Sequence, residues 1–368
     1  MNPMQPETER AEMQCVAMPD AAVTAALAAN IDLAAPVRHI VTFHLGGLSD
    51  LLFTLPALLA LRESFEGAMI YAVVRPELAP LLEGSPLVDE ILLRPRGGIS
   101  AQAALMVKLR AHHMDIAVAF SPSRNTTLLA WSSGATVRIG FATAHMEPLL
   151  THAVLQEGTA TVETYLDLVR ALGCQTRQYD YCNLLRIAPG SWQQADALLA
   201  EHGIEAPFVV AAPEAGRKRG IKEWPAEHWA AALDELAASY PIVLIGTRPA
   251  TAITNLLRSS DRVFDCTGRT DLPTLAALCG RARWFLGIDS GPLHLAAAMG
   301  IPSVGIFGPS DYYLTGPRGV PHRIARHAVE CSPCMLPKCK WTGADERKCL
   351  TLLAPQEVVR TARELVGL

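Results

Sequence analysis

Residues 284–310 read WFLGIDSGPLHLAAAMGIPSVGIFGPS, and this stretch decides the predicted fold. An apolar run of the strand type, residues 284–288, is interrupted at Asp289 by residues that favour turns. The alanine-rich run 293–299 favours a helix, and residues 303–307 form a second apolar run. The stretch therefore predicts a strand, a tight loop, a short helix and another strand.

The loop of this unit is a candidate site for an anion. A helix that starts where a strand ends presents unpaired backbone N–H groups, and Gly291 would allow a ligand to approach them. Asp289, Ser290 and His294 cluster around this point and could hold the hydroxyls of a nucleotide whose phosphates lie at the helix end. The alternative is that Asp289 and Ser290 only cap the helix, with His294 on the helix surface.

Composition narrows the class of protein. The chain has 368 residues, of which 50% are hydrophobic and 18% are charged, so two domains with large cores are expected. A formal net charge of −4 gives no reason to expect nucleic-acid binding. The sequence contains no run of eighteen apolar residues and starts without a secretory signal, which predicts a cytoplasmic protein. Its nine cysteines are then expected to be free or metal-bound rather than disulfide-paired.

Strand and helix patterns alternate along most of the chain. They predict an α/β fold with two Rossmann-like, doubly wound parallel-sheet domains that face a cleft. The predicted divisions are an N-terminal extension at 1–36, a first domain at 37–185, a second domain with a four-cysteine loop at 190–353, and a C-terminal helix at 354–368. Loops at the carboxyl ends of both sheets would converge on the cleft and form a ligand site.

Four cysteines lie close together near the end of the second domain. They are Cys331, Cys334, Cys339 and Cys349, and the first two have the C-x2-C spacing that lets two thiolates share a metal. Four thiolates would suit a structural zinc or iron ion that holds the loop near the cleft. The alternative is four reduced cysteines that help to pack the loop.

Three strings resemble one known family. HLGGLSDLLFTLPALLALRESF at 44–65, KEWPAEHW at 222–229 and CTGRTDLPTLAALCGRARWFLGIDSGPLHLAAAMG at 266–300 are similar to motifs of glycosyltransferase family 9, the ADP-heptose:lipopolysaccharide heptosyltransferases. The resemblance runs from about residue 38 to the end. The chain departs from the family pattern at Ser49, where a glycine is usual, and after Gly246, where the usual acidic residue is absent.

The resemblance implies a two-domain GT-B enzyme that inverts the anomeric centre and needs no metal or other cofactor for transfer. The first domain would bind the acceptor and the second the nucleotide sugar. By spacing alone, Asp50 caps a helix that starts at Leu51. The family pattern instead makes Asp50 the base that deprotonates the acceptor hydroxyl. Nucleotide-sugar binding is expected at Asp289, Ser290, Gly291, His294, Gly268 and Thr270.

Lys222 is a candidate for stabilising the negative charge of the leaving group. It follows a strand end directly before Glu223 and Trp224, where a helix must start, so the loop is pinned. We expect its ammonium to contact the donor diphosphate and stabilise the leaving group. The alternative is a lysine in a solvated loop.

The implied reaction transfers a heptose, or a related sugar, from ADP-heptose to a hydroxyl. The acceptor stays open between lipopolysaccharide core, another surface glycan, a protein and a small molecule. Peripheral contact with the inner membrane is a further expectation. The alternatives are a second enzyme of the same fold, such as a nucleotide-sugar epimerase, and a non-catalytic protein that binds nucleotide sugars or assists assembly.

Overall fold

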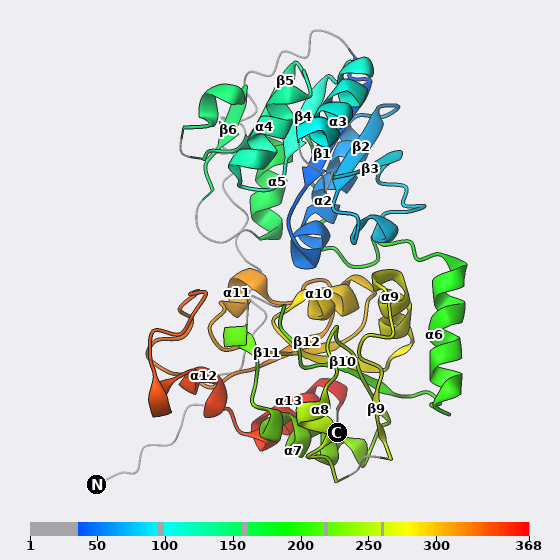
Figure 1. The fold of residues 1–368 in the computed structure, drawn as a ribbon, viewed down its shortest axis with the longest axis vertical. Coiled ribbons are helices and arrows are strands. Elements are labelled where there is room, and N and C mark those ends of the chain that lie inside the picture. Colours follow the sequence, from blue (N-terminus) through cyan, green and yellow to red (C-terminus); the bar gives the residue numbers. More distant parts are fainter. Residues whose placement is uncertain are drawn as a thin grey trace.

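The computed structural model contains two six-stranded parallel sheets, each covered by helices on both faces (Figure 1). It describes residues 36–94, 99–143, 145–156, 161–216, 220–258 and 261–367. The α/β prediction is therefore confirmed. The predicted N-terminal extension, apart from residue 36, lies outside the described residues.

The first sheet and its helices occupy the N-terminal half of the chain. Its strands are β1 (His39–His44), β2 (Met69–Val74), β3 (Glu90–Leu93), β4 (Ile116–Ala119), β5 (Val137–Phe141) and β6 (His152–Val154). Its α-helices are α2 (Leu48–Ser64), α3 (Ile99–Ala111), α4 (Arg124–Ser132) and α5 (Val162–Arg170). The 3-10 turns η1 (Ala79–Leu81) and η2 (Glu147–Leu149) interrupt its loops.

The second sheet begins after the helix α6 (Pro189–Glu201). Its strands are β7 (Val209–Ala212), β8 (Ile242–Leu244), β9 (Val263–Asp265), β10 (Trp284–Ile288), β11 (Ser303–Ile306) and β12 (His322–Ala325). Its helices are α7 (Ala226–Ala237), α8 (Thr251–Thr254), α9 (Leu272–Arg281), α10 (Gly291–Ala298), α11 (Tyr312–Thr315), α12 (Lys348–Thr351) and α13 (Pro355–Val366). Two 3-10 turns, η3 (Gly220–Lys222) and η4 (Gly343–Asp345), lie in its loops.

The two sheets share one topology. The strand order is β3-β2-β1-β4-β5-β6 in the first and β9-β8-β7-β10-β11-β12 in the second, and the paired strands run parallel. In each sheet the chain starts in the middle, builds outward on one side, and then crosses to the other. The crevice at that crossover, outside the carboxyl ends of the strands, is where such sheets bind ligands.

Helices from the two domains meet between the sheets. Helices α3 and α4 cover the outer face of the first sheet, and α7 and α13 cover the outer face of the second. The inner faces carry α2 and α5 in the first domain and α9 and α10 in the second. Their buried side chains form one continuous core in which α2 packs against α10. The N-termini of α2 and α10 are thereby brought together at the crevice.

Candidate active site

One cavity of about 510 Å³ collects the strand ends of both domains. From the first domain it is lined by residues that follow β1 and β2, and from the second by residues that follow β7, β8, β9 and β10. Its volume is of the size that ordinarily holds a small organic ligand. The lining is mixed: it contains polar side chains and the apolar side chains of Ile245, Leu272 and Leu275.

Asp50 lies on the first-domain wall of the cavity. Helix α2 starts at Leu48 with Gly47 as its N-cap, three residues earlier than the sequence predicts. Asp50 is therefore not the N-cap, and the prediction of a helix starting at Leu51 is wrong. Its carboxylate instead closes the first turn, because Oδ2 accepts the Gly47 N–H at 2.7 Å.

The second oxygen of Asp50 contacts a tyrosine of α5. Tyr165 donates its hydroxyl to Oδ1 at 3.3 Å. Burial, and then the negative charge of Asp50, raise the pKa of Tyr165, so this hydroxyl stays protonated and remains a donor. Both partners of the carboxylate are therefore uncharged. A carboxylate held by neutral donors on the wall of a cavity can accept a proton from a ligand.

Asp289 lies on the opposite wall and is only 5% exposed. The Lys222 ammonium contacts its Oδ2, and Nε2 of His294 lies 3.6 Å from its Oδ1. Burial alone would raise the pKa of Asp289, but His294 and the charge of Lys222 outweigh it and hold the pKa well below its usual range. Asp289 is thus a permanent carboxylate that fixes the ammonium beside the cavity.

His294 lies behind Asp289. The alternative that the sequence left open, with His294 on the helix surface, is therefore wrong. The ring is 1% exposed and does not line the cavity. Its Nδ1 lies 2.9 Å from the hydroxyl of Tyr181, and Phe53 of α2 packs edge-on against it. Burial raises the pKa of Tyr181, which keeps that hydroxyl protonated and able to donate to Nδ1. Nδ1 of the ring therefore faces Tyr181 and Nε2 faces Asp289.

The N-terminus of α10 opens into the same cavity. Ser290 is the N-cap but makes no side-chain cap bond, and its Oγ is buried without a partner among the described residues. Gly291 is required because a Cβ there would lie 2.9 Å from the side chain of Leu48. The close approach that the sequence suggested is thus made by the first domain. The unpartnered hydroxyl of Ser290, at the positive end of the α10 dipole, suits an anion.

Two other predicted residues lie on the neighbouring loops. Thr270 lines the cavity, whereas Gly268 does not. Gly268 has φ +73 and donates its N–H to the carbonyl of Gly246 at 2.7 Å, so it supports the loop after β8. The predicted residues that line the cavity are therefore Asp50, Thr270, Asp289, Ser290 and Gly291.

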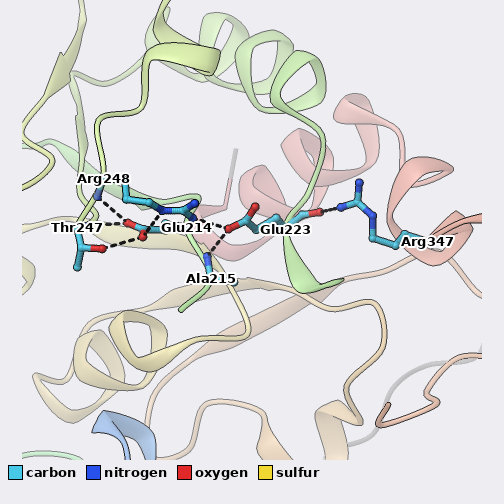
Figure 2. Close-up of polar contacts among 6 residues, drawn as sticks. All are labelled: Glu214, Ala215, Glu223, Thr247, Arg248 and Arg347. Atoms are coloured by element: carbon cyan, nitrogen blue, oxygen red, sulfur yellow. Dashed lines mark hydrogen bonds and ion pairs between the residues drawn. The ribbon is translucent and has the colours of Figure 1, made fainter. Parts of the chain in front are cut away.

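Sequence reasoning missed two charged residues of the cavity wall, Arg75 after β2 and Glu214 after β7. The Glu214 carboxylate accepts hydrogen bonds from the Thr247 hydroxyl and from Nε of Arg248, each at 2.7 Å (Figure 2). Its carboxylate also lies over Gly246, where an added Cβ would be 2.8 Å from Oε2. An acidic group is therefore present beside Gly246, supplied by the neighbouring strand. Both residues follow strand ends, which was the signal that could have found them.

The four cysteines surround one small cavity of about 20 Å³, away from the first. Burial, followed by the charges of the other three cysteines, raises the pKa of the Cys349 thiol to about 11. Within the described part of the chain, no group of three or more His, Cys, Asp or Glu side chains is placed to hold a metal ion. The structural zinc or iron stays a prediction that elemental analysis of purified protein can test.

A crevice between two doubly wound domains, with a carboxylate on one wall and a helix N-terminus on the other, is the arrangement of a GT-B glycosyltransferase. Residues 102–344, more than half of the chain, match the model of glycosyltransferase family 9 (heptosyltransferase). The chain therefore belongs to this family of glycosyltransferases. Over its described residues, none of its helices has the length and apolar character needed to cross a membrane.

Individual proteins agree with the family. Lipopolysaccharide heptosyltransferase 3 of Escherichia coli is 26% identical over 285 residues, which cover 73% of this chain and 83% of that protein. The family 9 glycosyl transferase of Veillonella parvula DSM 2008 superimposes with a TM-score of 0.78 at 23% identity, over 90% of this chain and 97% of that one. The ADP-heptose lps heptosyltransferase II of E. coli superimposes with a TM-score of 0.73 at 22% identity, over 90% of this chain and 98% of that one. The GT-B prediction is confirmed.

Proposed function

We propose that this protein transfers a heptose from ADP-heptose to a hydroxyl of the lipopolysaccharide core. The observation that carries the proposal is one cavity with Asp50 on its first-domain wall and Asp289 and the start of α10 on the other, with Lys222 ion-paired to Asp289 beside that wall. The names of the relatives supply the sugar and the glycan. In this proposal the first domain binds the acceptor and the second binds the nucleotide sugar.

The division of charge supports a single displacement. Asp50 takes the proton of the acceptor hydroxyl as its oxygen bonds to the anomeric carbon, and the bond from that carbon to the diphosphate breaks. ADP leaves toward α10, where the helix N-terminus and the Lys222 ammonium balance its charge. Because the base and the leaving group lie on opposite walls, attack comes from the face opposite the departing bond. The anomeric configuration is then inverted without a metal ion.

The proposal is tested by incubating the purified protein with ADP-heptose and lipopolysaccharide truncated in its inner core. We expect ADP release that depends on the acceptor, a product of inverted anomeric configuration by NMR, and the same rate in excess EDTA. Binding of ADP-heptose without ADP release, across lipopolysaccharide, other glycan and protein acceptors, would support the non-catalytic alternative. Loss of activity in EDTA that added metal restores would contradict the metal-independent step.

A lipid-linked acceptor also bears on where the protein acts. We expect a cytoplasmic protein that meets its acceptor at the surface of the inner membrane. Sedimentation with vesicles that contain the truncated lipopolysaccharide, compared with vesicles that lack it, checks this. If the protein sediments with neither kind of vesicle, the membrane contact is removed from the proposal.

A further inference from the structure

Glu223 is held on two sides by arginines that come from distant parts of the chain (Figure 2). Arg248, after β8, donates its Nη2 to Oε1 of the Glu223 side chain at 2.8 Å. Arg347, from the segment before α12, donates its Nη1 to the Glu223 carbonyl at 2.9 Å. The first contact needs the carboxylate and the second needs only the backbone. Together they fix both the side chain and the main chain of one residue.

The position that these contacts fix is adjacent to the site. Lys222 immediately precedes Glu223, and consecutive Cα atoms are held about 3.8 Å apart, so a shift of one moves the other. The Lys222 ammonium reaches the buried carboxylate of Asp289 beside the cavity. A lysine side chain has four rotatable bonds, and its reach alone does not fix its charge in one place. The anchored backbone therefore limits where the ammonium can be.

Arg347 links this loop to the four-cysteine segment. Its backbone N–H donates to Sγ of Cys339 at 3.3 Å, and it is the N-cap of the helix that carries Cys349. Arg347 adopts a left-handed backbone (φ 53, ψ 32), which non-glycine residues rarely adopt unless neighbouring contacts hold them. Ile221, on the other side of Lys222, lines the small cavity between the cysteines. The segment thus contacts the loop at Glu223 and shares a cavity with it at Ile221, on the two sides of Lys222.

We propose that Arg347 is a positioning residue for Lys222, and that the four-cysteine segment serves the reaction by bracing the loop that carries this lysine. Arg347 does not line the 510 Å³ cavity, so it acts through the Glu223 carbonyl and not on the ligand. Arg248 braces the same residue from the side of Glu214, which forms part of the cavity wall. The inference rests on the proposed role of Lys222.

A double-mutant cycle on the full chain tests this, with ADP release from ADP-heptose in the presence of truncated lipopolysaccharide as the readout. Lys222→Met should lower kcat on the order of 100- to 1000-fold, the usual loss of one preorganised electrostatic donor. Arg347→Met should lower kcat about 10- to 100-fold, the penalty of a misplacement of roughly 1 Å, with little change in KM. In the Lys222→Met background, Arg347→Met should have almost no further effect.

Two other variants separate positioning from general stability. Arg347→Lys keeps a donor for the carbonyl and should recover much of the lost kcat. Arg360→Met removes an arginine of α13 whose ion pair with Glu364 is exposed, and should leave kcat unchanged. An equal loss of kcat from Arg347→Met in both backgrounds would overturn the positioning role while leaving Lys222 in place. If Arg347→Met does not fold, the same comparison is made with Glu223→Gln, which weakens the side-chain contacts with Arg248 and the Ala215 N–H and leaves the carbonyl that Arg347 contacts. A native kcat in Lys222→Met would instead refute the role of Lys222 itself.

Discussion

Two aspartates face each other across the cavity, one from each domain, and their surroundings differ. Asp50 follows β1 and is held by the Gly47 N–H and the Tyr165 hydroxyl, neither of which is charged. Asp289 follows β10, is buried, and contacts the Lys222 ammonium and the His294 ring. The same side chain, placed after a central strand of each sheet, is thus given two electrostatic environments.

This difference separates two kinds of chemistry. A carboxylate locked to a lysine cannot readily take up a proton, because protonation would leave the buried ammonium without its counter-charge. A carboxylate with neutral donors loses much less when it is protonated. In the proposed reaction the first domain therefore supplies the proton acceptor, and the second supplies a fixed positive charge next to a helix N-terminus. Transfer of a sugar with departure of an anionic leaving group requires both the proton acceptor and the positive charge, on opposite sides of the sugar.

The largest effect is expected from Asp50→Asn. The amide oxygen can still accept the Gly47 N–H, so the start of α2 should be kept, but the base is lost. We expect a melting temperature near that of the native protein, unchanged binding of ADP-heptose by calorimetry, and a transfer rate roughly 10²- to 10⁴-fold lower. Asp311→Asn is a matched control, because Asp311 also accepts a backbone N–H at a helix start, from Tyr313 of α11. A native rate in Asp50→Asn would reduce Asp50 to a structural residue.

A smaller effect is expected where the two domains touch. In Gly291→Ala the new Cβ would lie 2.9 Å from Leu48, so the N-termini of α10 and α2 must separate. We expect a loss of up to about 3 kcal/mol, the range for overpacking a tight contact, seen as a lower melting temperature and slower transfer. Leu48→Gly in the same chain removes the Cβ that meets the new methyl group and should restore part of both. If the second substitution restores neither, the contact between the domains is not what Gly291 is needed for.

The sequence predicted much of this site because one rule covers it. Parallel strands bind ligands at their carboxyl ends, and Asp50, Thr270, Asp289, Ser290 and Gly291 all follow such ends by a few residues. The helix was predicted from the alanine-rich run 293–299 with Pro292 at its first position, and in the structure it spans Gly291–Ala298, so it begins one residue earlier.

Other features depended on contacts that no local pattern contains. The pairing of Glu214 with Arg248 joins two adjacent strands through side chains 34 residues apart. The early start of α2 follows from Asp50 accepting a backbone N–H three residues behind it. The burial of His294 could have been predicted, since α10 is apolar on every side and must lie inside the fold. Its contact with Tyr181, 113 residues away, could not.

The smallest predicted effect extends the comparison from the aspartates to two buried histidines. His44, at the end of β1, lies between the hydroxyls of Thr42 and Thr54 at 2.9 and 3.0 Å, whereas His294 lies beside a carboxylate. With only neutral partners, burial lowers the pKa of His44 from 6.5 to about 3. The unfolded chain then binds the extra proton between these values, and the folded protein does not. The contribution of His44 to stability is therefore complete above pH 6.5 and falls as the pH drops toward 3.

The loss should be roughly 1.4 kcal/mol for each pH unit below 6.5, so about that much at pH 5.5. Urea unfolding at pH 7.5, 6.5 and 5.5 measures it. His44→Gln keeps polar atoms near both threonines and cannot titrate, so it should be less stable at pH 7.5 but lose less stability on acidification. His113→Gln, which replaces an exposed histidine, should keep the native slope. If His44→Gln and the native protein lose the same free energy between pH 6.5 and 5.5, His44 is not the group that titrates. The contrast between side chains with neutral partners and side chains with charged partners would then rest on the aspartates alone.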